Sequence, residues 1–269
     1  MKKRIYFLAI ITLMFFACSK DKDDNIENNN QGTMFHLDSF PLALGNGWRY
    51  YTEIDIDTEG VHYSDSKYDS YWNVISDTLI NSVHTSKVAQ LDSNYDGTKT
   101  FGYTYYANKA DGFYGVAYAG NSSSFNLKNI GSKFKIRSAL FGSFGNGVKG
   151  GDSLYIPDTS LHLMKFPVCI GNSWCSYEYG SSDYYRKWIG FELVTTTAGS
   201  FQCVKLQLFH DGDHNGQPDD NFPFVYQYFS TKGLVQETMQ ESLIFNSVTT
   251  EHVTTGHLTK ITKLVQVNF

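Results

Sequence analysis

Side chains that carry oxygen ligands crowd the segment HDGDHNGQPDD, which runs from His210 to Asp220. They alternate along the chain around Gly216 and are Asp211, Asp213, Asn215, Gln217 and Asp219. Calcium is a hard cation that binds carboxylate and carbonyl oxygens, and a loop that supplies them from alternate residues around a glycine turn suits it. The segment is therefore a candidate calcium site, with calcium as the one candidate cofactor.

The candidate loop also has an interpretation without a metal. It resembles EF-hand calcium loops over its first six positions, but the twelfth position is Phe222, where a bidentate Glu would close the site. An acidic hairpin loop with an Asn-Gly turn that binds nothing explains the same residues. A bound calcium would be structural rather than catalytic. His210 and His214 would suit zinc, but no third ligand has a matching spacing.

The first eighteen residues bear on export. A basic stretch, residues 2–4, precedes twelve mostly apolar residues, Ile5 to Phe16, and then Ala17 and Cys18. A membrane-spanning helix needs roughly 20 apolar residues, so this stretch is too short to be one. Residues 1–17 are therefore predicted to be a signal peptide.

The signal resembles that of bacterial lipoproteins, which implies that Cys18 is diacylated and becomes the mature N-terminus. Phe15 and Phe16 stand where such signals usually carry Leu and a small residue. An ordinary secretory signal with an incidental cysteine is the alternative. Acyl chains contribute roughly 0.8 kcal/mol per buried CH₂, so a lipidated chain would be held at a membrane.

Residues 18–33 are predicted to be the lipidated cysteine and a flexible tether. The stretch from Ser19 to Gly32 is polar and acidic and lacks aromatic residues, so it cannot bury enough apolar area to order itself. The acidic run after Cys18 resembles the export signal of surface lipoproteins in Bacteroidota-type bacteria. This implies an anchor on the cell-surface side of the outer membrane. The periplasmic face is the alternative, because a plain solvated linker explains the same charges.

Charge and cysteine content limit the partners. Without the basic residues 2–4, 19 basic residues stand against 27 acidic ones, which argues against nucleic acid. The expected partners are the membrane, through the lipid anchor, and a protein, glycan or lipid ligand. Cys169, Cys175 and Cys203 allow one disulfide and leave one thiol over, and the sequence does not select the pair.

Alternation of apolar and polar residues dominates the chain after the tether. Trp48, Tyr50, Ile54 and Ile56 are predicted to share the buried face of one strand. Further strands are expected at residues 71–80, 82–92, 99–108, 112–120, 184–197, 200–210, 222–230, 233–250 and 256–269. Gly-containing pairs typical of hairpin turns separate many of these runs, so the chain is predicted to be an all-β antiparallel protein.

One phrase occurs twice: FPLALGNGWRYY at residues 40–51 and FPVCIGNSWCSY at residues 166–177. Proline suits a strand start, Gly-Asn a tight turn, and Trp an inward anchor. The predicted strand-opening residues are Phe40, Pro41, Gly45, Asn46 and Trp48 in the first copy and Phe166, Pro167, Gly171, Asn172 and Trp174 in the second. Two related β units, 34–130 and 160–269, are expected, with a Gly-rich connection at 131–159.

The first phrase, together with GSFQCVKL and YQYFSTKGLVQE, resembles secreted bacterial domains that open with F-P-x-x-x-G-N-x-W and close with a Y-Y-x-x-x-G-L-V hairpin. Many of these are lipoproteins of unknown function. They are similar to lipoprotein-carrier half-barrels, so the resemblance implies that the two units form curved sheets or half-barrels around a hydrophobic groove. The motifs are structural, and the resemblance supplies no catalytic residue.

Other motifs contribute little chemistry. GNGVKG, from Gly145 to Gly150, matches the G-x-G-x-x-G of nucleotide sites, but a predicted strand follows where a helix is needed. We interpret it as part of the connection. G-x-S-x-G, H-E-x-x-H and C-x-x-C are absent, which favours a protein without enzymatic activity.

Tyrosine-rich stretches allow two interpretations, cross-strand aromatic pairs and a sugar-stacking surface. The residues concerned are Tyr103, Tyr105, Tyr106, Tyr184 and Tyr185.

Three functions are compatible with these features. We expect a lipid-anchored, non-enzymatic binding or accessory module whose ligand is not specified by the sequence. The first alternative is a carrier that holds a lipid or acyl chain in a hydrophobic groove. The second is a surface glycan hydrolase, which needs two carboxylates roughly 5 to 9.5 Å apart.

Overall fold

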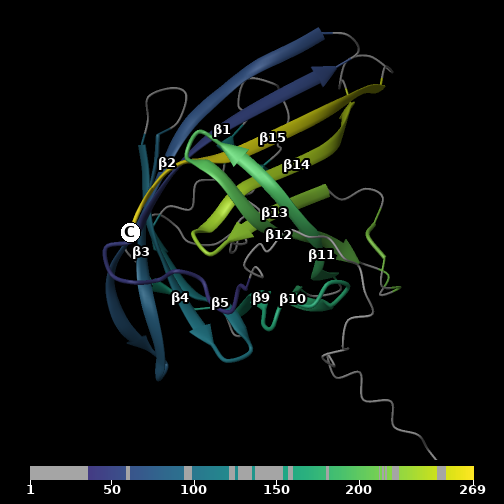
Figure 1. The fold of residues 1–269 in the computed structure, drawn as a ribbon. Helices are drawn as coiled ribbons and strands as arrows, with labels where there is room; N and C mark the ends of the chain where they lie inside the picture. The colour runs from purple at the N-terminus through teal and green to yellow at the C-terminus, as the bar shows by residue number, and fades with distance from the viewer. Residues whose placement is uncertain are drawn as a thin grey trace, which may run out of the picture. The chain divides into compact units, whose positions relative to one another are not determined.

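Strands make up nearly all of the regular structure (Figure 1). A computed structural model of the chain describes residues 36–58, 61–93, 99–120, 125–126, 135–136, 154–156, 160–179, 182–211, 213, 215, 217–219, 224–246 and 253–269. The strands are β1 (Gly47–Thr58), β2 (Val61–Ile80), β3 (Val83–Ser93), β4 (Lys99–Lys109), β5 (Gly112–Gly120), β6 (Phe125–Asn126), β7 (Lys135–Ile136), β8 (Leu154–Tyr155), β9 (Leu161–Lys165), β10 (Ser173–Tyr179), β11 (Ser182–Thr196), β12 (Gly199–Asp211), β13 (Phe224–Ser230), β14 (Gly233–Asn246) and β15 (Val253–Asn268). None of the residues described here forms a helix with the length and hydropathy to cross a membrane.

Thirteen of these strands form one antiparallel sheet. Its order is β10-β11-β12-β13-β14-β15-β1-β2-β3-β4-β5-β8, with β9 paired to β5 as well. Strands β6 and β7 pair with each other. The all-β antiparallel fold is therefore confirmed, and each expected strand run coincides with a strand of the sheet. The strands β6 to β9 are absent from the expected runs because segments of two to five residues are too short to establish a period. The first ten residues of β2 also lie outside the expected runs.

The two expected β units contribute to the same sheet because β1 pairs with β15 as well as with β2. Residues Phe35–Phe269 form one compact unit that contains every strand. The limits of the two smaller units stay a prediction. The Gly-rich connection, the signal peptide, the tether and Cys18 fall largely or wholly outside the described residues.

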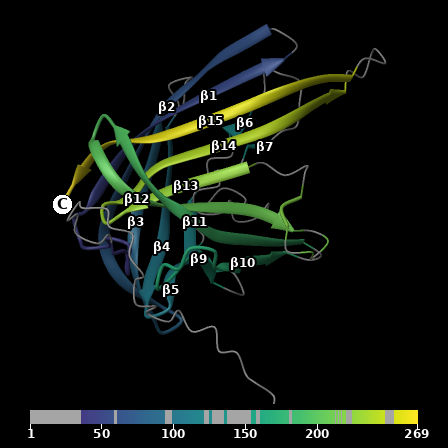
Figure 2. The ribbon, with the colours of Figure 1, turned by 45° about the vertical axis from the view of Figure 1, so that its right-hand side comes forward.

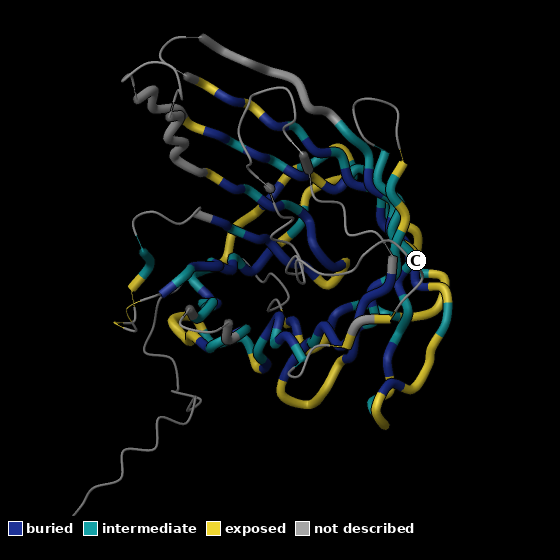
Figure 3. Tube along the Cα trace, turned by 180° about the vertical axis from the view of Figure 1, so that it is seen from behind, coloured by how far each residue is buried: buried dark blue, intermediate teal, exposed yellow. Residues whose placement is uncertain are grey.

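The predicted inward face of β1 is confirmed. Trp48, Tyr50, Ile54 and Ile56 are all buried, with 1–5% of each residue exposed. Figure 3 shows the same alternation of buried and exposed positions along neighbouring strands. Thr52 lies on this face too and is 1% exposed. A polar residue at an inward position is the first sign that the interior is not uniformly apolar.

The sheet curves until its two ends lie side by side, with β9 next to β10 in both ribbon views (Figures 1 and 2). Side chains join these ends. The indole N–H of Trp174 on β10 donates to the carbonyl of His162 on β9 at 2.8 Å. The indole N–H of Trp188 on β11 donates to the carbonyl of Lys165 at 3.0 Å. The sheet is thus curved into a nearly closed barrel rather than two half-barrels (Figure 1), and tryptophan hydrogen bonds hold its two ends together.

Both copies of the repeated phrase form the same turn. The backbone N–H of Gly45 donates to the carbonyl of Val74 at 2.9 Å, and that of Gly171 donates to the carbonyl of Trp188 at 2.8 Å. Both glycines have a positive φ, 89° for Gly45 and 92° for Gly171. A shared local geometry therefore accounts for the shared letters, while an origin by duplication stays a prediction.

Each phrase is attached to a hairpin turn of the other half of the sheet. The indole N–H of Trp48 donates to the carbonyl of Lys232, between β13 and β14, at 2.6 Å. The backbone N–H of Phe166 donates to the carbonyl of Asp111, between β4 and β5, at 2.9 Å. Each half of the sheet therefore donates a hydrogen bond to a turn of the other half, in addition to the β1–β15 pairing.

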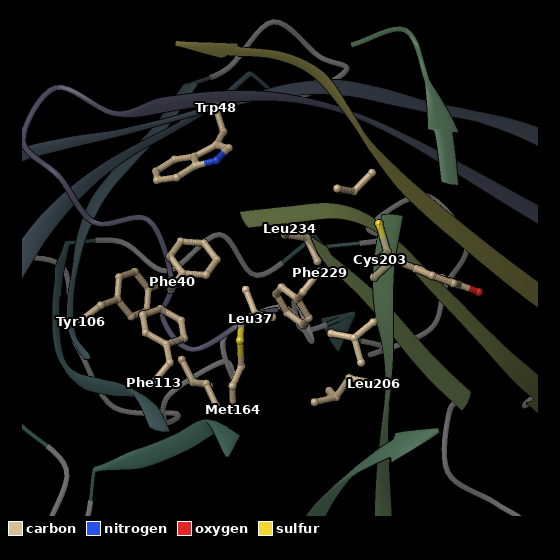
Figure 4. Packing of buried hydrophobic residues seen from close by; sticks show 14 of the residues in the cluster. Leu37, Phe40, Trp48, Tyr106, Phe113, Met164, Cys203, Leu206, Phe229 and Leu234 are labelled. Carbon is tan, nitrogen blue, oxygen red and sulfur yellow. The ribbon is translucent and has the colours of Figure 1, made fainter. Parts of the chain in front are cut away.

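The largest apolar core lies at this crossing point (Figure 4). The rings of Phe40 and Phe113 stack with their centroids 4.5 Å apart, and Tyr106 packs against Phe113 at 5.1 Å. Phe229 and Leu234 approach from the other half of the sheet (Figure 4). The core thus joins residues that are far apart in the sequence.

Replacement of Gly45 or Gly171 by alanine tests the role of the repeated turn. A Cβ at either position meets no atom within 4 Å, so the expected cost comes from the left-handed backbone alone. That cost is about 1–2 kcal/mol. We expect Gly45→Ala and Gly171→Ala each to lower the free energy of unfolding by this amount in urea titrations. Gly190→Ala, which also has open space and lacks a positive φ, is the control. Equal effects at all three positions would contradict the expectation.

Candidate functional site

The acidic loop begins at the end of β12. Asp211 is the last residue of that strand and is 1% exposed, whereas Asp213 is exposed and Asp219 is half-buried. One carboxylate oxygen from each of these three residues lies within 4.8 Å of the others. The structure thus brings together the three carboxylates of the candidate calcium site.

Hydrogen bonds within the loop hold the two amide residues beside the carboxylates. The backbone N–H of Asn215 donates to Oδ1 of Asp211 at 3.0 Å, and its side-chain amide donates to Oδ2 of Asp213 at 2.8 Å. The side-chain oxygen Oδ1 of Asn215 in turn accepts from the backbone N–H of Gln217 at 2.7 Å. His210 Nδ1 bonds to Oδ2 of Asp219. These bonds suit either a loop that binds calcium or a hairpin that needs no ion.

A second group of polar side chains lies on the inner face of the sheet, where the sequence predicts no site. We call it the polar belt, and its members are Thr52, Ser176, Arg186, Gln227, Glu237, Lys260 and Thr262. Each of these residues is at most 6% exposed. Burial of polar and charged groups costs free energy unless hydrogen bonds compensate, so the contacts of the belt must be accounted for one by one.

Strand register places the belt on one face. Four belt residues are paired from one strand to the next. Gln227 on β13 is opposite Glu237 on β14, which is opposite Thr262 on β15, and Thr262 is opposite Thr52 on β1. Because directly opposed residues of paired strands share a face, these four side chains form a row. The hydroxyls of Thr52 and Thr262 are 2.9 Å apart.

Hydrogen bonds extend the row into a chain centred on Glu237. Its carboxylate accepts from the side-chain amide of Gln227 at 2.8 Å and from Nζ of Lys260 at 3.3 Å. Nη1 of Arg186 donates to the side-chain oxygen Oε1 of Gln227 at 2.8 Å, and Nε of Arg186 donates to the hydroxyl of Ser176 at 3.0 Å. One carboxylate is thus linked to two buried cations.

Burial shifts the titration of these groups. It lowers the pKa of Arg186 to about 10, against the opposing effect of the Glu237 charge. Burial also acts to lower the pKa of Lys260, but the charges of Tyr68, Glu237 and Asp92 and the hydrogen bond to Glu237 outweigh it and leave that pKa above its usual value. Both cations therefore stay protonated at neutral pH.

The Tyr50 hydroxyl lies next to the belt. It is buried and has no hydrogen-bond partner among the residues that the structure describes. Burial raises its pKa well above the usual value, and the charges of Tyr106 and Glu237 raise it further. Tyr50, two residues before Thr52 on the same face of β1, therefore keeps a protonated hydroxyl at the edge of the belt.

Apolar side chains lie on both sides of the belt. On one side is the large core that contains Leu206, Phe229 and Leu234. On the other is a smaller cluster, here called the distal cluster, formed by Ile54, Ile56, Leu208, Val225, Met239 and Leu258. All six residues of the distal cluster come from β1 and β12–β15, which are neighbours in the sheet. The belt therefore separates two apolar regions of one face.

The sequence contains a signal for the belt, namely polar residues at positions where the strand alternation predicts apolar ones. Gln227 lies between Val225 and Phe229 at the two-residue spacing of one strand face, and both neighbours are buried. Lys260 lies at the same spacing from Leu258, which is 0% exposed. Polar residues in inward positions were the available clue, but only the register shows that they meet.

The remaining candidate residues have structural environments. Tyr184 and Tyr185 are opposite His210 and Phe209 on β12 and make ring contacts with them at 5.2 and 5.7 Å, which confirms cross-strand pairing there. Nζ of Lys87 lies 3.6 Å from the ring centroid of Tyr103. The Gly145–Gly150 motif lies outside the described residues.

Cys203 has a free thiol and is completely buried. Burial raises the pKa of this thiol to about 12. Neither Cys175 nor Cys203 forms a disulfide, so none of the three pairings that the sequence leaves open among Cys169, Cys175 and Cys203 is formed.

Comparison with known proteins adds two structural similarities. No protein-family model and no curated protein matches the chain. A Bacteroides fragilis protein described as exported, with a YmcC-like fold, aligns over 87% of this chain and 99% of its own, with 12% sequence identity and a TM-score of 0.42. A Parabacteroides distasonis protein described as a lipoprotein aligns over 85% and 97%, with 14% identity and a TM-score of 0.33.

Calcium titration of the acidic loop separates its two interpretations. If the loop binds calcium, millimolar calcium raises the Tm of the protein, and Asp213→Asn abolishes the rise because it removes one charged ligand. Glu192→Gln, which changes a half-exposed acid on β11, is the control and keeps the rise. A Tm that does not change with calcium in any of the three proteins would identify the loop as a hairpin that binds no calcium.

Replacement of Glu237 by glutamine tests the belt. The substitution keeps the shape but leaves Lys260 and Arg186 buried without a carboxylate, so we expect the free energy of unfolding to fall by about 3–5 kcal/mol. Glu192→Gln breaks the exposed pair with Lys205, whose charged atoms are 3.6 Å apart, and should cost less than about 1 kcal/mol. Urea unfolding measures both. Similar small losses for the two variants would show that the belt does not depend on the Glu237 charge.

Proposed function

We propose that this protein is a lipid-anchored, non-enzymatic binding module of the bacterial cell envelope. The signal sequence with Cys18 and the acidic tether support the anchor, and the tether favours the cell-surface side of the outer membrane. Its partners are then the membrane, through the anchor, and a ligand held by the sheet.

The polar belt is the observation that carries the binding role. A buried ion pair often contributes no more stability than well-packed apolar residues in its place. The belt nevertheless lies on the inner face of the sheet and interrupts two apolar clusters, one on each side of it. Such an arrangement is typical of a ligand site, in which a few placed polar groups lie within an apolar lining.

The distal cluster favours a carrier as the second candidate. An acyl chain requires a continuous apolar face, and the distal cluster presents buried aliphatic side chains from five strands of one curved sheet. A tethered carrier would hand a lipid over locally at the membrane rather than shuttle it. The surface glycan hydrolase stays the third hypothesis.

Native mass spectrometry tests the proposed function. Residues 33–269 can be used without the anchor because Phe35–Phe269 is a compact unit with all the strands. The protein is purified from bacteria in millimolar calcium and then incubated separately with bacterial lipid extract, glycans and peptides. We expect one small-molecule mass to remain bound, and a lipid mass would favour the carrier.

Two outcomes contradict the proposal. One is a bare protein after every incubation, which would argue against a binding role. The other is turnover of a glycan or peptide, which would favour an enzyme. The variant Lys260→Met, checked for folding by circular dichroism, removes a charged group of the belt and should lose the bound mass, whereas Lys205→Met, outside the belt, is the matched control and should keep it.

A further inference from the structure

We propose that the inner face of β11–β15 and β1 binds the anionic head of a single-chain amphiphile at Arg186, Lys260 and Tyr50. This inference rests on the proposed binding function and specifies its ligand class. The head is an oxyanion, either carboxylate or phosphate, and the tail is an alkyl chain that lies along the distal cluster.

Charge is unbalanced at the belt. Arg186 and Lys260 are 2% and 3% exposed, and Glu237, the one belt carboxylate that the structure describes, is 0% exposed. The same carboxylate acts on both cations. Asp92 is the other carboxylate whose charge acts on Lys260, and it is only half-buried on β3. Buried charges are normally paired, and the two buried cations share one fully buried carboxylate, so an anion on the inner face would complete the pairing.

The Tyr50 hydroxyl supplies a donor. Within the described part of the chain it is buried and makes no hydrogen bond, although most buried hydroxyls do. Tyr50 lies two residues before Thr52 on the same face of β1, and Thr52 belongs to the row that contains Glu237, so the hydroxyl is at the edge of the belt. An oxyanion near Arg186 and Lys260 would give this hydroxyl an acceptor, and such charge-assisted hydrogen bonds are strong.

The strand register places the two cations beside the distal cluster. Arg186 and Lys260 belong to one row across the sheet, and the residues between them in this row are Leu208, Val225 and Met239. Both charged groups thus flank aliphatic side chains on the same face. A ligand that meets this row needs an alkyl part as well as an anionic part, which defines an amphiphile.

Binding of matched probes tests the inference. Isothermal titration of residues 33–269 uses palmitate, hexadecyl phosphate and hexadecanol, each below its aggregation concentration, with acetate as the short anion. We expect the two anionic probes to bind at least tenfold more tightly than hexadecanol, and acetate to bind undetectably. A preference for palmitate or for hexadecyl phosphate identifies the head.

Two variants assign the head to its residues. Lys260→Met should weaken palmitate binding at least tenfold and leave hexadecanol binding unchanged, while Lys205→Met, on the outer face, should change neither. Tyr50→Phe should weaken palmitate binding severalfold, yet unfold at an equal or higher urea concentration because the removed hydroxyl has no partner. A purely structural role of Tyr50 would not weaken binding while leaving stability undiminished. Tyr50→Phe therefore tests the inference even if Lys260→Met fails to fold.

Equal affinities for palmitate and hexadecanol would overturn the inference and leave the proposed function intact. The inference would also be overturned, and the proposed function kept, if no alkyl probe bound while a glycan or peptide remained bound in native mass spectrometry. Loss of every ligand in both experiments would overturn the proposed function itself.

Discussion

The pairing of β1 with β15 is the constraint on which the rest of the structure depends. It runs from Gly47, opposite Asn268, to Thr58, opposite Gly256, and it joins the halves before and after the connection into one sheet. The Thr52–Thr262 contact and the register of Lys260 with Ile54 both lie in this pairing. Because these contacts link the first and last strands, the inner face is complete only when the whole chain has folded.

Curvature follows from a second set of contacts. Strand pairing alone leaves β9 and β10 unpaired with each other, and tryptophan indoles bridge them by hydrogen bonds to backbone carbonyls. Trp48 and Trp174 occupy corresponding places in the repeated phrase. Trp48 donates to the carbonyl of Lys232 in the other half of the chain, and Trp174 donates to the carbonyl of His162 at the opposite end of the sheet. The large rings fill the core while their N–H groups fix the approach of the backbone.

Glu237 offsets part of the free-energy cost of burying positive charge on the inner face of the sheet. It is the shared counter-charge of Arg186 and Lys260, and it also influences Tyr50. The belt is therefore a coupled network in which no pair can be assigned an independent energy. Its position between two apolar regions is what connects the fold to the proposed binding function.

The sequence by itself determined most of the long strands, the inward face of β1 and the positions of the glycine turns, because alternation and turn preference are local properties. It also indicated the acidic loop, whose ligands are close in sequence. It did not determine that the two halves share a sheet, that Trp174 reaches β9, or that Arg186, Glu237 and Lys260 meet. Those contacts join residues from different strands, and their distances depend on strand order, register and curvature. Only the tertiary structure decided them, because each strand reads as an ordinary amphipathic segment until its neighbours are known.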